Sequence, residues 1–443
     1  MPDSSLLRAL AQSLLAGEPS VEHLAAGCGR TLGRPWRWLR PLAKRYLDQF
    51  GRGIRPRQRD VVQFLKNDSG FKRAQSKYFS QLSVSNWLSE PQPMQPVAAG
   101  KTWDVPAIET VGDLANWLGL DTGELRWFAD LKALGCKTNR PRLGHYHYRI
   151  LAKKDGGIRL LEVPKPRLKD LQQQILAWIL AKIPSHSAVH GFVKKRSIKT
   201  FAAPHVGRRV VLRMDVGDFF PTFIGARIQS LFRTLGYPEP VADLLGGICT
   251  NATPREVWSE ISFATDSTRL SNARRQYSRP HLPQGAPTSP ALANLGCYRL
   301  DCRLAALAKS AGATYTRYAD DLAFSGDKEF EKRAERFGLH VASILREEGF
   351  AVRHRKTRIM RQGVRQHLAG LVTNERLNVQ RSVFDRLKAT LTNCARWGPE
   401  SQNRERHPQF RMHLEGRVAF VEMINSTRGK RLRTIFKRIQ WPG

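Results

Sequence analysis

The sequence predicts an α+β fold, in which a sheet is backed by helices, and two observations lead to this prediction. Near the N-terminus, apolar residues recur at helical spacing, at Leu6, Leu7, Leu10, Leu14 and Leu15. From Tyr148 onward, short β-rich segments are followed by longer amphipathic ones. Strands and helices that alternate with long crossovers fit a sheet backed by helices better than a doubly wound sheet.

The individual elements are predicted in order along the chain. Residues 1–75 should form helices, and residues 90–106, which hold four prolines, should form a linker. Two short helices with a turn at 119–122 are expected in 110–131, a β-hairpin in 148–164 and a helix in 168–183. A β-rich segment at 210–220 and helices at 224–249 precede a polar segment at 250–282, which we interpret as an exposed loop or insertion. The remaining elements are a helix at 289–312, strand–turn–strand at 313–326, a helix at 330–350, short strands in 351–360 and 367–374, and mainly helices at 378–443.

The charge of the chain indicates the kind of partner it has. The 443 residues carry 73 Lys and Arg but only 38 Asp and Glu, so the formal net charge is +35. A protein this basic usually has a polyanion as its partner. No apolar run of about 18 residues is present to span a bilayer, so we expect no membrane partner.

The cysteines and the N-terminus indicate the compartment. The six cysteines are scattered without a CxxC pair, which argues against both a disulfide framework and a zinc knuckle. The first twenty residues lack the basic region of a signal peptide. We therefore expect a cytoplasmic protein.

Residues 34–73 are rich in Arg and Lys, and aromatic residues are interleaved among them at Trp36, Trp38, Tyr46, Phe50 and Phe64. Such a mixture suits nucleic-acid binding through phosphate contacts and base stacking. It equally suits a helical bundle with aromatic residues in its core and solvated charges outside. Both interpretations stay open at this point.

Acidic residues in two β-rich segments suggest the chemistry. Asp215 lies in the segment 212–220, and Asp320 and Asp321 lie at a turn between two apolar strand arms. Neighbouring carboxylates repel each other, so a tight turn that bears both usually needs a cation, and hard divalent cations prefer oxygen ligands. If Asp215 meets the pair from an adjacent strand, the site can hold two Mg²⁺ ions about 3.5–4 Å apart. A lone Asp-Asp turn is more often a solvated hairpin tip, so the interpretation depends on the other motifs.

Three motifs in order resemble those of reverse transcriptases. Tyr318-Ala319-Asp320-Asp321 resembles the YxDD box, Leu282 to Pro290 is similar to the LPQGxxxSP box, and Asp215 to Phe220 resembles the first aspartate motif. The combination is most similar to bacterial retron-type enzymes and covers roughly residues 110–440. It implies a right-hand polymerase fold with fingers at 106–209, a palm at 210–375 that includes the segment 250–282, and a helical thumb at 376–443. A basic helical extension with its linker, 1–105, would precede these parts.

The resemblance also implies roles for single residues. Asp215, Asp320 and Asp321 match the catalytic metal ligands, and Val216 is assigned beside them to both the metals and the nucleotide. Phe220 matches the aromatic gate against a 2′-hydroxyl, and Gln284 matches the residue beside the incoming nucleotide. Arg159 resembles the Arg that clamps the triphosphate, and we assign Lys154 to the same nucleotide site. Lys356 matches the Lys that protonates pyrophosphate as a general acid, whereas the family pattern gives Asp218 no metal role.

Further segments resemble parts of retron enzymes that recognise RNA. Val189 to Val193 and the basic residues after it are similar to a second block, and Ala202 to His205 resembles the NAxxH segment, with Phe201 in place of Asn. Gln366 to Asn374 resembles a QxVTGLxVN segment, from which Leu368-Ala369-Gly370 departs. Residues 416–443 resemble basic thumb helices. The RNA-binding residues implied are Lys194, Lys195, Arg196, His205, Arg417 and Lys430.

The function implied by the resemblance is RNA-directed DNA synthesis. A retron enzyme uses dNTPs to copy part of a structured noncoding RNA into single-stranded DNA, and the family has a role in defence against phage, often with a separate effector protein. Two alternatives stay open at this point. The chain could belong to another bacterial reverse transcriptase lineage, or it could be an inactive polymerase fold that serves as an RNA-binding scaffold.

Overall fold

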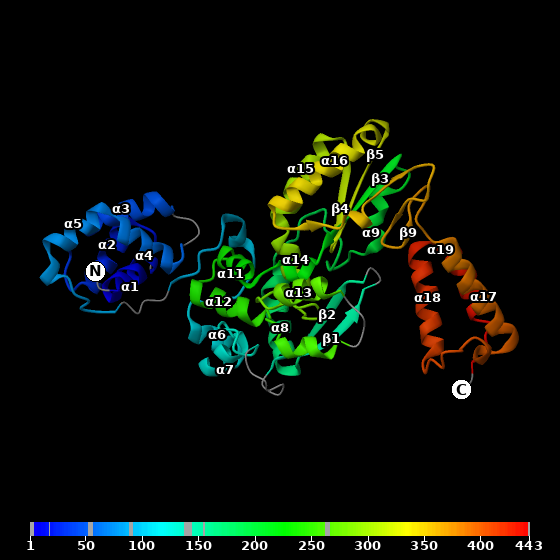
Figure 1. The fold of residues 1–443 in the computed structure, drawn as a ribbon, viewed down its shortest axis with the longest axis horizontal. Coiled ribbons are helices and arrows are strands. Elements are labelled where there is room, and N and C mark those ends of the chain that lie inside the picture. The colour runs from blue at the N-terminus through cyan, green and yellow to red at the C-terminus, as the bar shows by residue number, and fades with distance from the viewer. Residues whose placement is uncertain are drawn as a thin grey trace. The chain divides into compact units, whose positions relative to one another are not determined.

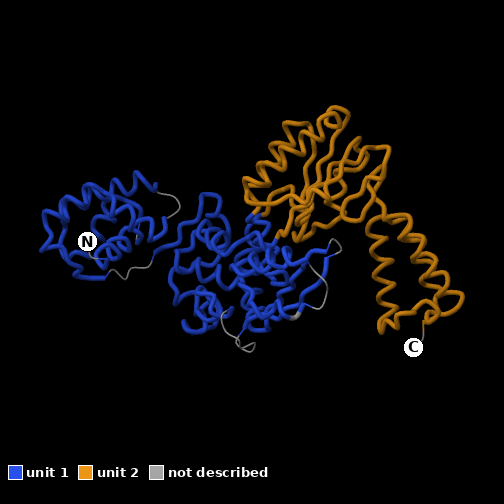
Figure 2. The backbone as a smooth tube through the Cα atoms, viewed as in Figure 1, with its two compact units in different colours: residues 1–184, 220–296 blue, residues 185–219, 297–443 orange. Residues whose placement is uncertain are grey.

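The computed structural model describes residues 4–16, 18–51, 56–87, 92–136, 144–153, 156–261 and 266–441. The chain forms two compact units (Figure 2). Unit 1 comprises Met1–Pro184 and Phe220–Gly296, and unit 2 comprises Ser185–Phe219 and Cys297–Gly443. Each unit is described by itself.

Unit 1 begins with five helices that we call the N-terminal bundle, shown in blue in Figure 1. They are α1 (Ser4–Leu15), α2 (Val21–Thr31), α3 (Leu39–Phe50), α4 (Gln58–Asn67) and α5 (Ser69–Lys77). The predicted leucine stripe of α1 is buried and packs with apolar residues of α2, α3 and α4. Tyr46 and Phe64 are buried in this core, and Trp36, Trp38 and Phe50 pack against it. Tyr46 and Phe64 are therefore core residues, whereas Trp36, Trp38 and Phe50 lie at the edge of the core.

The rest of unit 1 surrounds a β-hairpin. The short helices α6 (Val111–Leu118) and α7 (Thr122–Ala129) each begin with a capping box. Strands β1 (Tyr146–Ala152) and β2 (Ile158–Pro164) pair antiparallel. They are followed by α8 (Pro166–Trp178), α11 (Gly225–Thr234) and α12 (Glu239–Ile248). The predicted helices and hairpin are confirmed here, because each coincides with a run of suitable spacing between turn residues.

The segment 250–282 differs from the prediction of an exposed loop. It contains a 3₁₀ helix at Arg255–Glu260 and the helix α13 (Ser267–Tyr277), which Asp266 caps through the backbone N of Thr268. Trp258 and Tyr277 are buried against Ile158 and Leu160 of β2. The sequence did not predict this packing, because the few apolar residues that cover the hairpin are widely spaced within a polar segment.

Unit 2 is built on an antiparallel sheet of five strands. Its strands are β3 (Val210–Gly217), β4 (Thr314–Tyr318), β5 (Asp321–Gly326), β6 (Ala351–Val352) and β7 (Arg358–Arg361). The order is β4-β5-β3-β6, and β7 also pairs with β3. Helices α15 (Tyr298–Ser310) and α16 (Lys328–Glu347) pack on this sheet, as Figure 1 shows. Phe324 of β5 stacks on Tyr315 of β4 and contacts Phe337 of α16.

The predicted helix at 289–312 is two helices. Helix α14 (Ser289–Gly296) ends where α15 is about to begin. Gly296 lies against the Phe223 ring, where a Cβ would come within 2.7 Å of a ring carbon. Its carbonyl accepts a hydrogen bond from Nη2 of Arg227 at 2.8 Å. Tertiary packing therefore interrupts a sequence whose spacing alone would continue the helix.

The C-terminal part of unit 2 is helical, as predicted. A small sheet with the order β10-β9-β8 comprises β8 (His367–Leu368), β9 (Leu371–Val372) and β10 (Asn378–Val379). Helices α17 (Arg381–Trp397), α18 (Phe410–Ile424) and α19 (Ser426–Phe436) follow and share one apolar core. Within the described ranges, none of the helices is both long and apolar enough to cross a membrane.

Candidate active site

The strand register of unit 2 brings the three predicted aspartates together. Asp215 near the end of β3 is the direct partner of Asp321 at the start of β5. The backbone N of Val216 donates to the carbonyl of Asp320 at 2.9 Å, so Asp320 lies beside the same strand end. The turn between β4 and β5 is tight, and Ala319 adopts a left-handed φ of 53°. The side chain of Val216 is buried, so any contact of this residue with a ligand would be made by its backbone.

Basic side chains hold two of these carboxylates. Nζ of Lys356 donates to Oδ2 of Asp215 at 2.8 Å. Arg213, two residues before Asp215 on β3, donates from Nε and Nη2 to Oδ1 of Asp321 at 2.9 and 2.7 Å. Lys356 had been predicted as a catalytic residue, and the structure places it at the aspartates. Arg213 was not singled out from the sequence, although alternation along β3 puts it on the same face as Asp215.

Asp218 is linked to Asp215 through Arg353, whose Nη1 lies 3.7 Å from Oδ1 of Asp215. It follows β3 with a φ of 44°, and Nη2 of Arg353 donates to its Oδ1 at 2.8 Å. The family pattern gives Asp218 no metal role, and this assignment stays a prediction.

The electrostatics of the site favour a cation. Burial raises the pKa of Asp320, and the charges of Asp321 and Asp215 raise it further. Burial also raises the pKa of Asp321, although Arg213 opposes this shift. Oδ1 of Asp215 is buried and has no hydrogen-bond partner. Nη1 of Arg353 lies 3.7 Å from this oxygen. A set of carboxylate oxygens, one of them buried without a hydrogen bond, fits a hard divalent cation such as Mg²⁺. In the described residues no three His, Cys, Asp or Glu side chains are already gathered as a metal site, while Lys356 and Arg213 contact the carboxylates.

A buried ion pair supports the turn that carries Asp320 and Asp321. Arg317 on β4 and Asp301 on α15 are both fully buried, and two hydrogen bonds of 2.7 and 2.8 Å join them. Nη1 of Arg317 also donates to the carbonyl of Ala319 at 3.2 Å. The backbone of Arg317 also pairs with the segment that precedes Lys194 and Lys195. Its N donates to the carbonyl of Ala188, and its carbonyl accepts from the N of His190.

The prediction that His205 contacts RNA is corrected by the structure. Its side chain is fully buried in unit 2, and its ring nitrogens hydrogen-bond to the hydroxyls of Ser325 and Thr316 at 2.6 and 2.7 Å. Burial and nearby positive charge lower the pKa of His205 to about 3, so the ring is neutral at pH 7. It therefore fastens the segment after α9 (Ile198–Ala202) to strands β4 and β5. A motif resemblance cannot separate such a role from direct contact.

The other residues predicted to bind RNA lie on two parts of unit 2. Lys194 and Lys195 are exposed, and Lys195 has a φ of 63°. The guanidinium of Arg196 donates to the carbonyls of Ser187 and Val189, so it also holds its own loop. Arg417 is half-buried on α18, and Lys430 is exposed on α19.

The predicted nucleotide-binding residues outside β3 lie in unit 1. Arg159 is exposed on β2 opposite Leu151, and Phe220 is half-buried. Gln284 is fixed to the hairpin, because the N of Glu162 donates to its carbonyl at 2.9 Å. A Cβ at Gly285 would come within 2.8 Å of the carbonyl of Glu162, and Gly285 has a φ of 137°, so this approach requires glycine. Lys154 and Asp155 at the hairpin tip lie outside the described residues.

A buried polar network that sequence reasoning missed anchors the same region. The carboxylate of Glu162 is fully buried and accepts from Nε2 of His281 at 2.8 Å, from Nδ2 of Asn251 at 2.8 Å and from the Thr253 hydroxyl at 3.0 Å. Glu162 is 89, 91 and 119 residues from Asn251, Thr253 and His281, and these three partners fall in the segment interpreted as a loop. No local pattern connects such residues.

This network predicts a pH-dependent contribution to stability. Burial lowers the pKa of His281, but the charge of Glu162 and its hydrogen bond raise it overall. The stabilisation is therefore fully present below the unfolded pKa of about 6.5 and is lost as the pH rises through the higher folded pKa. We expect the difference in thermal stability between the wild type and His281→Gln to shrink as the pH rises above neutrality. A difference that stays constant from pH 6 to pH 9 would contradict the prediction.

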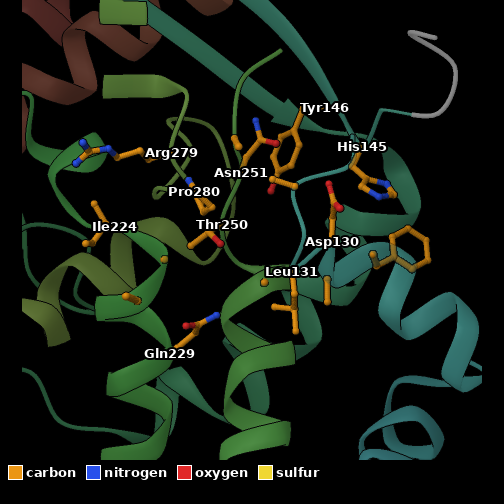
Figure 3. A pocket seen from close by; sticks show the side chains of 17 residues that line it. Asp130, Leu131, His145, Tyr146, Ile224, Gln229, Thr250, Asn251, Arg279 and Pro280 are labelled. Carbon is orange, nitrogen blue, oxygen red and sulfur yellow. The ribbon is translucent and has the colours of Figure 1, made fainter. Parts of the chain in front are cut away.

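Unit 1 also contains a cavity of about 340 Å³ between α7, β1 and the segments around 224–229 and 250–252, shown in Figure 3. Its polar groups are largely engaged within the protein. The carboxylate of Asp130 accepts from the backbone N of Leu134 and of Gly135, and Asn251 donates to Tyr148 and Glu162. We assign no ligand to this cavity.

Comparison with known proteins identifies the family of the chain. The family described as "Reverse transcriptase (RNA-dependent DNA polymerase)" matches residues 151–373, a range that contains all three aspartates. The chain belongs to the reverse transcriptase family. Within this family it is of the bacterial retron type, an RNA-directed DNA polymerase, as its relatives indicate.

Three relatives define this position. The retron Mx65 reverse transcriptase of Myxococcus xanthus is 42% identical over 74% of this chain and 72% of its own length. The retron Mx162 enzyme of the same organism is 36% identical over 73% of this chain and 65% of its own length. The retron Ec86 enzyme of Escherichia coli is 29% identical over 67% of this chain and 82% of its own length.

Proposed function

We propose that this protein copies part of a structured noncoding RNA into single-stranded DNA by two-metal nucleotidyl transfer. The observation that carries the proposal is the convergence of Asp215, Asp320 and Asp321 at paired strand ends, with a buried Oδ1 on Asp215 that accepts no hydrogen bond from the described residues. Reverse transcriptases generally use divalent metal ions. When bound, two Mg²⁺ ions would supply Lewis-acid stabilisation of the attacking and leaving oxygens.

The residues of the chain would then act as follows. The three aspartates would hold the ions. The backbone hydrogen bond between Val216 and Asp320 would keep Asp320 beside the strand end that carries Asp215. Lys356 would give up its contact with Asp215 and donate its Nζ proton to the leaving pyrophosphate. Arg213 would remain beside Asp321 and limit the negative charge of the site.

The right-hand arrangement is also part of the proposal. We assign the β1–β2 hairpin with its surrounding helices to the fingers, the five-stranded sheet to the palm, and α17 to α19 to the thumb. The antiparallel sheet with helices packed on it supports the palm. Exposed Lys194, Lys195 and Lys430 together with Arg417 would contact RNA phosphates, which position an RNA but do not read its sequence. A role in phage defence with a separate effector protein rests on the family resemblance.

Phe220 provides a test of sugar selection. We expect Phe220→Ala to admit ribonucleotides, because the ring would no longer clash with a 2′-hydroxyl, and to lower the preference for dNTPs at least about tenfold. Single-nucleotide incorporation of dNTP and rNTP pairs measures this ratio. Phe219→Leu, a change at the neighbouring ring that packs on Phe350, serves as the control. Unchanged sugar discrimination in Phe220→Ala would refute the gate.

The product tests the function as a whole. The protein is expressed with its native flanking locus and purified, and the copurifying nucleic acid is sequenced before and after RNase and debranching treatment. We expect a discrete single-stranded DNA joined to a short RNA through a 2′,5′ linkage. If no DNA copurifies but an added primer is extended on RNA, the enzyme acts outside this scheme. If neither occurs with Mg²⁺ and dNTPs, the scaffold interpretation replaces the polymerase.

A further inference from the structure

The N-terminal bundle lies outside residues 151–373, which match the family, and contains a cavity that the polymerase chemistry does not use. The cavity has a volume of about 600 Å³ and lies between the segment leading into α3 and helix α5. This volume falls within the range of about 300–1,000 Å³ that is usual for small-ligand sites.

The walls of this cavity combine positive charge with aromatic rings. Its cationic residues are Arg34, Arg37, Arg45, Arg73 and Lys77, and its aromatic residues are Trp36, Trp38 and Tyr78. None of the described residues that line it is acidic. Arg45 is held from outside the lining by Asp68, at 2.6 and 2.8 Å, whereas Arg37, Arg73 and Lys77 are exposed. The lining of the cavity is therefore positively charged, and no carboxylate among the described lining residues offsets this charge.

The aromatic residues differ from those of the bundle core. Tyr46 and Phe64 are buried, but Trp36 and Trp38 are only partly buried and pack against the core from its edge. The Trp36 ring contacts Tyr78, with ring centroids 4.7 Å apart, and the guanidinium carbon of Arg34 lies 3.6 Å from its centroid. Nε1 of both tryptophans is buried without a hydrogen-bond partner. Because these nitrogen atoms are shielded from solvent, only the ring carbons of the two tryptophans could contact a ligand in the cavity.

We propose that this cavity binds a nucleotide unit, with the base displacing the Arg34 guanidinium from the Trp36 ring beside Tyr78 and the phosphate at Arg73 and Lys77. Aromatic faces accept any base, and each stacked base contributes roughly 1–3 kcal/mol. Exposed Arg and Lys side chains suit phosphate oxygens. The source that the observations favour is an unpaired stretch of RNA or DNA, because the cavity is open at the surface of a chain with a net charge of +35. A free mononucleotide has the same chemistry and is the second source to be tested. The bundle would thereby give the polymerase a second hold on its nucleic acid.

A pair of matched charge reversals tests the site in the full-length protein. Arg73→Glu/Lys77→Glu changes two exposed residues that line the cavity, and Lys66→Glu/Lys72→Glu makes the same change in charge at exposed residues of α4 and α5 that do not line it. The probe is a fluorescent, unstructured twelve-nucleotide RNA, measured by anisotropy across a range of salt. We expect the cavity variant to bind more weakly and its salt slope to fall by about 1.4, the loss of two single-strand phosphate contacts. The control should stay close to the wild type in slope.

Photo-cross-linking locates the base. With 5-iodouridine in the same RNA, we expect a cross-linked peptide that contains Trp36 or Tyr78, and Trp36→Leu should reduce it without a change in charge. If the variants affect only the binding of uridine monophosphate, the site stands and a free nucleotide is its ligand. Equal slopes for the two charge reversals, together with cross-links only outside residues 34–78, would overturn the inference. Primer extension on an unrelated template should be unchanged in the cavity variant, which separates this test from that of the polymerase.

Discussion

Replacing Asp320 or Asp321 by asparagine should abolish dNTP incorporation while RNA binding survives. Each change removes a charged oxygen from the site proposed to hold the metal ions, and the stabilisation lost is several kcal/mol, which lowers the rate by a factor on the order of 10³ or more. RNA binding should persist because the predicted contacts lie elsewhere, at Lys194, Lys195 and Lys430. Primer extension and filter binding of the same preparation measure both properties.

Asp218 offers a matched control for this prediction. It is also an aspartate close to β3, and Arg353 contacts it, but it is outside the proposed ligand set. Asparagine tolerates the left-handed backbone conformation of this position, and loss of a partly exposed ion pair costs at most about 1 kcal/mol. Asp218→Asn should therefore change the rate only a few-fold. If Asp320→Asn/Asp321→Asn keeps full activity, the metal assignment is wrong.

Replacing Asp301 by alanine should cause a large loss of stability in unit 2. The change leaves the fully buried guanidinium of Arg317 without its carboxylate, and breaking a buried pair in this way costs about 3–5 kcal/mol. Tyr315 also donates to Asp301 at 2.8 Å, so a second buried group loses its partner. We expect the unfolding transition of unit 2 to have a lower urea midpoint. The fluorescence of a fluorophore attached to unit 2 would measure this transition.

The surface pair of Glu329 and Lys332 is the control for this experiment. Both side chains are mostly exposed, and the Nζ–Oε1 distance is 2.8 Å. Glu329→Ala should leave the urea midpoint close to that of the wild type, because exposed ion pairs contribute little to stability. A loss in Asp301→Ala no larger than that of this control would show that the buried pair does not stabilise the unit. Activity should fall as well, because Arg317 also holds the carbonyl of Ala319 in the turn.

The sequence predicted much of this fold because local signals and global structure agree. The apolar segments on either side of Asp320 and Asp321 predicted two strands joined by a turn. The order of the motifs predicted that Asp215 lies beside this turn. Prediction failed where tertiary contacts decide. Phe223 and Arg227 end a helix at Gly296, and Glu162 gathers partners about ninety to 120 residues away.

The candidate site was likewise predictable only in part. The family motifs identified the acids and Lys356, but the partner of Asp321 is Arg213, which no motif marked. His205 looked like a contact residue and is a core residue, since its environment comes from strands more than a hundred residues later. Charge and aromatic content around residues 34–73 predicted either a core or a binding surface, and the bundle contains a core beside an open basic cavity.

The pairing of residues 188–190 with Arg317 connects the segment before Lys194 and Lys195 to the strand before Asp320. Arg317 hydrogen-bonds through its backbone to the segment that leads to Lys194 and Lys195. Two residues after Arg317, the turn that carries Asp320 begins. A Cβ at Gly191 would come within 2.6 Å of the N of Ala319, so there is no slack between the two. Residues 188–191 are therefore held directly against the turn that carries Asp320. A residue inserted into this loop would therefore move Lys194 and Lys195, two of the proposed phosphate contacts, relative to the turn that carries Asp320.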